Sequence, residues 1–172
     1  MQCDLCATGR FQSVREQTSC IACFAGQWNN ESGRRDCTDC GFGKFFGTRG
    51  STACIDCLAG LYAPRQGMLT CIGCELGRFQ PVKGTTSCRI CPPGKFAPVT
   101  HHEQCTLCFT GQYHNDWERA DCTNCSAGLY EPVEGQLSCT KCDTGMYGTA
   151  VGSSKYCCID CEIGRYQDQK GQ

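Results

Sequence analysis

Residues 74–88, CELGRFQPVKGTTSC, contain every feature that recurs along this chain. We predict a short strand over Gly77–Gln80 and a turn over Pro81–Gly84, because Pro fixes φ and Gly readily takes a positive φ. A return strand is then expected over Thr85–Cys88. The segment therefore predicts one small hairpin, carrying the aromatic Phe79 and bounded by cysteines.

The same pattern repeats along the whole chain with a period of 17 residues. Every repeat opens with a Cys-x-x-Cys pair, and a Gly follows three residues after the second Cys. The first cysteines of the pairs are Cys3, Cys20, Cys37, Cys54, Cys71, Cys88, Cys105, Cys122, Cys139 and, after a two-residue insertion, Cys158. Two residues beyond that Gly stands an aromatic residue: Phe11, Trp28, Phe45, Tyr62, Phe79, Phe96, Tyr113, Tyr130, Tyr147 and Tyr166. Such periodicity predicts one continuous repeat array over 1–172.

The composition explains how so small a hairpin can be stable. The chain has 21 cysteines among 172 residues, a share typical of a disulfide scaffold. An isolated hairpin is marginal in water, whereas a disulfide that closes a loop of about 15 residues contributes roughly 3 kcal/mol. We therefore predict a small disulfide-rich fold: an elongated tandem array of about ten 17-residue β-hairpin repeats with little or no helix. The ten aromatic side chains are expected in the interior, covering the disulfides.

Our favoured pairing joins the second Cys of each pair to the first Cys of the next, since each bond then encloses a Gly, an aromatic residue and a turn. This gives Cys6–Cys20, Cys23–Cys37, Cys40–Cys54, Cys57–Cys71, Cys74–Cys88, Cys91–Cys105, Cys108–Cys122, Cys125–Cys139 and Cys142–Cys158. Spacing alone leaves an interlaced pattern such as Cys3–Cys23 open. Bonds within Cys-x-x-Cys would restrain little of the chain.

The favoured pairing leaves over Cys3, Cys157 and Cys161, which are candidates for intermolecular bonds. Joined head to tail, two copies would place Cys3 at the spacing that Cys161 requires. We therefore expect self-association, or end-to-end continuation with further repeats. Met1 is followed directly by the first pair, without a signal peptide. The sequence is accordingly expected to be a segment of a longer chain or one unit of a polymer.

Other chemistries fit the pattern less well. Zinc sites use sets of four cysteines, but ten evenly spaced pairs show no grouping into fours, so we expect no metal and no other cofactor. A thioredoxin-like role needs a βαβ context around one reactive pair. His101, His102 and Glu103 occupy a turn position, and His114 with Asp116 lies in another turn, without a nucleophile. We expect solvated turns there and no enzyme.

Two N-glycosylation sequons occur, beginning at Asn30 and Asn124. Asn30 falls in a predicted turn and is the candidate acceptor of a glycoprotein. Asn124 lies inside a Cys-x-x-Cys pair, which argues against modification there.

The formal charge of −1 argues against nucleic acid as a partner. No apolar run is long enough to cross a bilayer, so we expect no membrane insertion by this segment. Disulfide density predicts a secreted, extracellular or cell-surface location.

The segments CIDCLAGLYAPRQGMLTC (54–71) and CTNCSAGLYEPVEGQLSC (122–139) resemble the ephrin-receptor-like cysteine-rich repeat. The likeness covers all ten repeats and extends to the first hairpin module of tumour-necrosis-factor-receptor repeats. In that module one disulfide closes the equivalent loop, so the resemblance implies pairing of the Cys6–Cys20 kind. It also implies extracellular arrays such as ectodomains and the cysteine-rich surface proteins of protists and algae. The uniform period favours a structural spacer or filament-forming subunit; a receptor or adhesin ectodomain that binds a protein ligand is the alternative.

Overall fold

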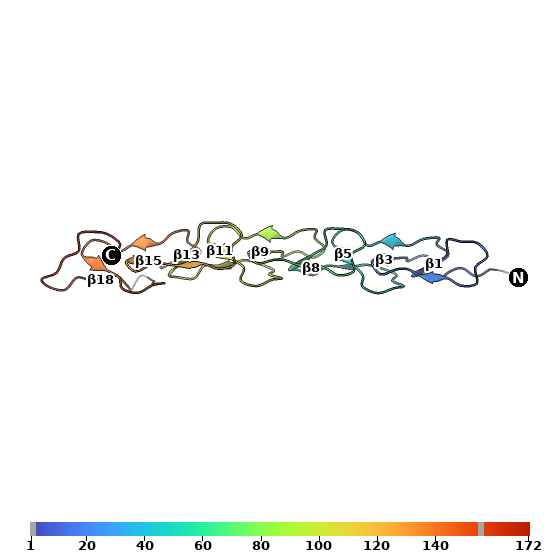
Figure 1. Cartoon of the computed structure of the whole chain (residues 1–172), viewed down its shortest axis with the longest axis horizontal. Coiled ribbons are helices and arrows are strands. Elements are labelled where there is room, and N and C mark those ends of the chain that lie inside the picture. Colours follow the sequence, from blue (N-terminus) through green and yellow to red (C-terminus); the bar gives the residue numbers. More distant parts are fainter. Residues whose placement is uncertain (1–2, 155–156) are drawn as a thin grey trace. The chain divides into compact units, whose positions relative to one another are not determined.

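The computed structural model describes residues 3–154 and 157–172, in which the regular structure consists of nine two-stranded antiparallel sheets (Figure 1). Each sheet pairs the strand that carries an aromatic residue with the strand inside the next Cys-x-x-Cys pair. The paired strands are β1 (Arg10–Phe11) with β2 (Ile21–Ala22), β3 (Gln27–Trp28) with β4 (Thr38–Asp39), β5 (Lys44–Phe45) with β6 (Ile55–Asp56), β7 (Leu61–Tyr62) with β8 (Ile72–Gly73), β9 (Arg78–Phe79) with β10 (Arg89–Ile90), β11 (Lys95–Phe96) with β12 (Thr106–Leu107), β13 (Gln112–Tyr113) with β14 (Thr123–Asn124), β15 (Leu129–Tyr130) with β16 (Thr140–Lys141), and β17 (Met146–Tyr147) with β18 (Ile159–Asp160). The prediction of tandem disulfide-rich hairpins with little or no helix is confirmed.

One detail of the predicted hairpin is wrong. The return strand is β10 at Arg89–Ile90, beyond the cysteine, and not Thr85–Cys88 before it. The segment before the cysteine instead serves a neighbouring repeat, since the carbonyl oxygen of Thr85 accepts a hydrogen bond from the backbone N–H of Ala63 at 3.0 Å. A segment whose backbone groups are used by the neighbour cannot also pair with its own first strand.

The chain divides into two compact units. The first comprises Met1–Cys74 and Gln80–Cys88, and the second comprises Glu75–Phe79 and Arg89–Gln172. Both are built from the same hairpins, linked in the same way inside each unit.

The core of each unit is formed by the second cysteines of the pairs from Cys6 to Cys142, with Ala63 in the first unit and Ala97 in the second. The second cysteine of a pair is called the inner cysteine below. From Cys23 to Cys142 the inner cysteines are 0% exposed. The aromatic residues are half-buried from Phe11 to Tyr147, and Tyr166 is exposed, so the expectation that they form the interior is wrong. A half-cystine is small enough to be buried completely between adjacent hairpins, whereas the larger aromatic side chains stay partly exposed.

Backbone hydrogen bonds tie seven inner cysteines to both neighbouring repeats: Cys23, Cys40, Cys57, Cys91, Cys108, Cys125 and Cys142. In the first unit the N–H of Cys23 donates to the carbonyl oxygen of Gly9 at 2.9 Å, and the carbonyl oxygen of Cys23 accepts from the N–H of Gly50 at 2.8 Å. The second unit repeats this arrangement at Cys108, which bonds to Gly94 and Gly135. Each buried backbone group therefore has its partner in the adjacent hairpin, as burial requires.

Two residues in each repeat have a positive φ. The first is the strand glycine, which stands three residues after the inner cysteine, such as Gly43 with φ 73°. The second is the turn residue, such as Gly84 with φ 70°. For seven strand glycines an added Cβ would overlap the carbonyl oxygen of the turn residue two repeats further on, as Gly43 meets Gly84; the others are Gly9, Gly26, Gly77, Gly94, Gly111 and Gly128. Glycine is thus required there by both backbone conformation and space.

We predict that Gly43→Ala destabilises the first unit by about 2 kcal/mol or more, since a positive φ and a backbone overlap act together. Gly41→Ala is the matched control, because Gly41 has no heavy atom within 4 Å of an added Cβ and no positive φ. The free energy of unfolding in denaturant measures both. Equal stability of the two variants would contradict the proposed packing.

Three turn residues are not glycine, namely Glu16, His101 and Glu118, and they have φ values of 61°, 67° and 60°. The left-handed conformation costs a residue with a Cβ roughly 1–2 kcal/mol. These repeats therefore keep the turn geometry at a cost in stability.

We predict that His101→Gly stabilises the second unit by about 0.5–1 kcal/mol, the relief of strain being partly offset by glycine's greater freedom in the unfolded chain. His101→Ala should bring no such gain, because alanine retains the Cβ. Denaturant unfolding of the two variants tests this; a gain in the alanine variant would show that loss of the imidazole is responsible.

Candidate functional site

The repeating site of this chain is the disulfide with the groups packed around it. The structure contains nine disulfides: Cys6–Cys20, Cys23–Cys37, Cys40–Cys54, Cys57–Cys71, Cys74–Cys88, Cys91–Cys105, Cys108–Cys122, Cys125–Cys139 and Cys142–Cys158. These are the pairs of the favoured pattern. The first eight bonds each join cysteines 14 positions apart, and the ninth, which spans the insertion, joins cysteines 16 apart. The described residues contain no bond of the interlaced kind.

Three cysteines form no disulfide in the part of the chain that the structure describes. Cys3 is exposed, while Cys157 and Cys161 are half-buried. Cys161 is the inner cysteine of the last pair, and it lacks the full burial of its counterparts. The intermolecular bonds expected for these three cysteines stay predictions.

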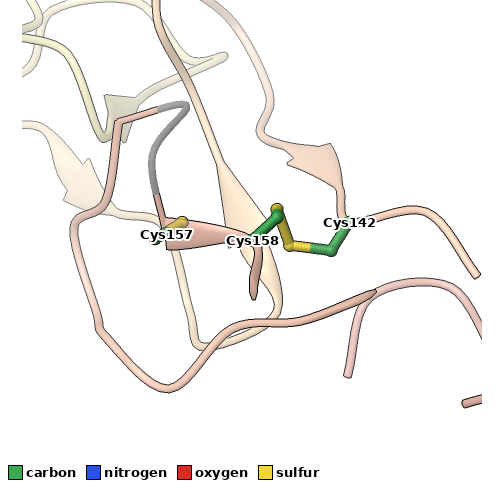
Figure 2. Close-up of side chains that lie close together, drawn as sticks. All are labelled: Cys142, Cys157 and Cys158. Carbon is green, nitrogen blue, oxygen red and sulfur yellow. A yellow bond between two sulfur atoms is a disulfide. The ribbon is translucent and has the colours of Figure 1, made fainter. Parts of the chain in front are cut away.

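Cys157 lies beside the ninth disulfide. Its Sγ and those of Cys142 and Cys158 all lie within 4.8 Å of one another, and Figure 2 shows the three side chains with the bond from Cys158 to Cys142. A metal that binds cysteine binds the thiolate, so this trio offers one thiolate while the disulfide is intact. The grouping is therefore a thiol next to a disulfide.

The residue directly after each aromatic, called the capping residue below, has a role that the sequence analysis missed. Six capping residues have a side-chain acceptor that receives the backbone N–H two positions on, at 2.9–3.2 Å: Gln12, Asn29, Gln80, His114, Glu131 and Gln167. Four of these side chains belong to buried residues: Asn29, Gln80, His114 and Glu131. They hold the start of the turn, which is the usual use of such acceptors. The signal in the sequence is the frequent Gln, Asn, His or Glu at that one position.

His114 is a buried capping residue with a titratable side chain. It is 4% exposed, and its Nδ1 accepts the backbone N–H of Asp116 at 3.1 Å. The proton of the neutral ring is therefore on Nε2, which has no hydrogen-bond partner among the described residues. Burial, aided by the nearby charge of Arg119, lowers the pKa of His114 below its ordinary value of 6.5, while Asp116 and Asp121 act in the opposite direction.

We predict that the second unit loses stability as the pH falls below 6.5. The unfolded chain then binds a proton at His114 that the folded chain resists, and the loss stops growing below the lowered pKa of the folded state. His114→Gln should flatten this dependence, because a glutamine retains the acceptor without titrating, as Gln80 does at the same position. The free energies of unfolding of the wild-type chain and of His114→Gln, measured between pH 5 and 8, test this prediction. Parallel profiles for the two proteins would contradict the prediction.

The remaining residues singled out in the sequence lie apart from any catalytic grouping. His101 and Glu103 are exposed, and His102 is half-buried. Asn30 is exposed after the buried Asn29, so its sequon is accessible; Asn124 lies in β14, where its Oδ1 accepts the amide of Gln112 at 2.9 Å. Glycosylation at Asn30 stays a prediction, as does its absence at Asn124, and the mass of each peptide before and after deglycosylation would test both.

The hollows of the surface are open and shallow. One of about 430 Å³ lies at the last repeat and is lined by Tyr147, Cys161, Glu162, Arg165, Tyr166 and Gln167. Another, of about 460 Å³, lies in the first unit over β4 and β5 and includes Trp28 and Lys44 in its lining.

Over the described residues there is no helix with the length and apolar character needed to span a membrane.

Each loop is closed by a disulfide, its inner half-cystine is buried, and backbone hydrogen bonds join it to the adjacent repeats. These features define a tandem cysteine-rich repeat array. Residues 60–101 and 117–157 match the family model described as tyrosine-protein kinase ephrin type A/B receptor-like. These stretches are similar to ephrin-receptor-like cysteine-rich repeats, as the sequence resemblance indicated, and the remaining hairpins share their spacing and disulfides. A search among curated proteins finds no significant match. Extensive disulfides and repeats of this family are features of extracellular regions.

Proposed function

We propose that this chain is a non-enzymatic, extracellular structural element, a disulfide-stapled rod that acts as a spacer or as a filament-forming subunit. The uniform repeat is the observation that carries this proposal. Every hairpin from Cys23 to Cys142 buries its inner cysteine completely. The exposed positions meanwhile vary from repeat to repeat, which suits a protein whose function is to maintain distance.

The surface of the last repeat supports continuation with a further repeat of the same kind. The strand glycines Gly145 and Gly164 have no heavy atom within 4 Å of an added Cβ, whereas Gly111 and Gly128 contact turn residues two repeats further on. Tyr166 is 86% exposed, although its counterparts are half-buried. A turn from a following repeat would cover these groups, and its first cysteine would reach Cys161.

The alternative is an ectodomain that binds a protein ligand, consistent with the receptor named in the family description. Exposed aromatic side chains favour it, because such residues are enriched at protein interfaces. Phe24 and Phe42 are exposed in the first unit, as are Phe109 and Trp117 in the second, with Trp117 59% exposed.

Negative-stain microscopy of the oxidised chain, with a non-reducing disulfide map, tests the proposal. We expect regular polymers held by a Cys161–Cys3 bond between copies, and Cys161→Ser should abolish that bond without unfolding the hairpins. Isolated rods in which Cys161 is a free thiol would favour the ectodomain. Compact particles, or a fold unchanged in strong reductant, would contradict both.

A further inference from the structure

The ninth repeat differs from the other repeats in three linked ways. It contains the two-residue insertion, its disulfide spans 16 positions, and it carries Cys157 directly before the bonded Cys158. In eight other repeats the residue before the first cysteine is an exposed, uncharged or acidic side chain: Ser19, Asp36, Ala53, Thr70, Ser87, Gln104, Asp121 and Ser138. Cys157 is half-buried at the corresponding place. The insertion therefore positions a thiol where other repeats present a solvent-facing side chain.

The position of this thiol is suited to thiol–disulfide exchange. The Sγ of Cys157 is within 4.8 Å of both sulfurs of the Cys142–Cys158 bond (Figure 2). The backbone N–H of Cys157 also donates to the carbonyl oxygen of Ser154, at 3.3 Å. A thiolate attacks a disulfide sulfur to form a new disulfide and release the other sulfur. The nucleophile and the bond that it would attack are thus already together.

We propose that Cys157 exchanges with the Cys142–Cys158 disulfide, so that the inner cysteine Cys142 is bonded alternately to Cys158 and to Cys157. Cys157 loses its thiol proton to water, and the thiolate attacks the Sγ of Cys142. The Cys142–Cys157 bond forms as the Cys142–Cys158 bond breaks, and the released Cys158 thiolate takes up a proton. One disulfide and one thiol are present before and after, so neither an oxidant nor a reductant is consumed.

Attack on the other sulfur gives a less favourable product. It would join Cys157 to Cys158, which are neighbours in the chain, in a small ring that strains the peptide between them, and it would leave Cys142 as a buried thiol. Bonding between Cys142 and Cys157 instead closes a loop only one residue shorter than the present one. Loop-closure entropy changes slowly with length. The two long-range isomers should therefore be similar in free energy.

The exchange makes the ninth repeat a thiol-reactive site whose free sulfur alternates between two adjacent positions. It would operate in a spacer, in a filament or in a receptor ectodomain, and so does not depend on the proposed function. The other eight disulfides have no third cysteine sulfur close enough to form such a trio among the described residues.

The first test uses wild-type full-length chain, exchanged at neutral pH, quenched with acid and alkylated. Peptide mapping should find the alkyl label on both Cys157 and Cys158, in a ratio within about tenfold of one, because the two loops differ little in closure entropy. In Cys157→Ser, the matched control, Cys158 should carry no label. Label confined to Cys157 in the wild-type protein would overturn the proposal.

The second test removes the present partner. In Cys158→Ser, peptide mapping of the oxidised chain should find Cys142 bonded to Cys157. A free Cys142 thiol beside a free Cys157 thiol, with the Cys125–Cys139 bond intact as evidence of folding, would overturn the proposal. Should Cys158→Ser fail to fold, the labelling ratio of the wild-type chain decides by itself. Both readouts concern residues 142–158 alone, so polymerisation through Cys3 and Cys161 does not affect them.

Discussion

The inner half-cystine, buried between hairpins, is the constraint on which the rest of this structure depends. A strand of two residues contributes few ladder hydrogen bonds and little apolar burial, so the hairpins are not stable as isolated units. The disulfide closes each loop, and the backbone of the same cysteine bonds to the repeats on both sides, as Cys23 does with Gly9 and Gly50. One residue thus stabilises the loop covalently and the stacking through hydrogen bonds.

Close stacking limits the choice of side chain at the surrounding positions. The strand glycine meets the backbone of the turn residue two repeats on, so its lack of a Cβ is a packing requirement and not only a conformational one. The turn residue needs a positive φ, which Glu16, His101 and Glu118 adopt despite their side chains. Four capping residues, Asn29, Gln80, His114 and Glu131, are buried although they are polar, because their side-chain acceptors receive the backbone N–H two residues on. In this protein, then, the interior consists largely of sulfur, backbone and side-chain acceptors.

Variation is tolerated where the repeat does not use the side chain. The exposed residues next to the inner cysteines range from Phe24 to Asp143. The ninth repeat shows that even the length of a loop can vary: its disulfide has a Cα–Cα distance of 5.6 Å, compared with 5.6–5.8 Å for the others. The loop absorbs the insertion, and the thiol of Cys157 comes to lie beside the bond. A change of two residues thus leaves the disulfide in place and adds a thiol beside it.

Spacing in the sequence was sufficient to define the repeat, the hairpin type and a favoured cysteine pairing, because these are local properties that recur at a fixed period. The family resemblance could likewise be found from CIDCLAGLY and CTNCSAGLY without coordinates. The return strand, the half-burial of the aromatics and the capping role of residues such as Gln80 and His114 were decided only by the tertiary structure. Each depends on contacts with the neighbouring repeat. For example, the carbonyl oxygen of Thr85 accepts a hydrogen bond from the backbone N–H of Ala63, so the segment that begins at Thr85 does not pair with the first strand of its own hairpin. The period of a sequence fixes which residues recur, but contacts between repeats determine which of them are buried.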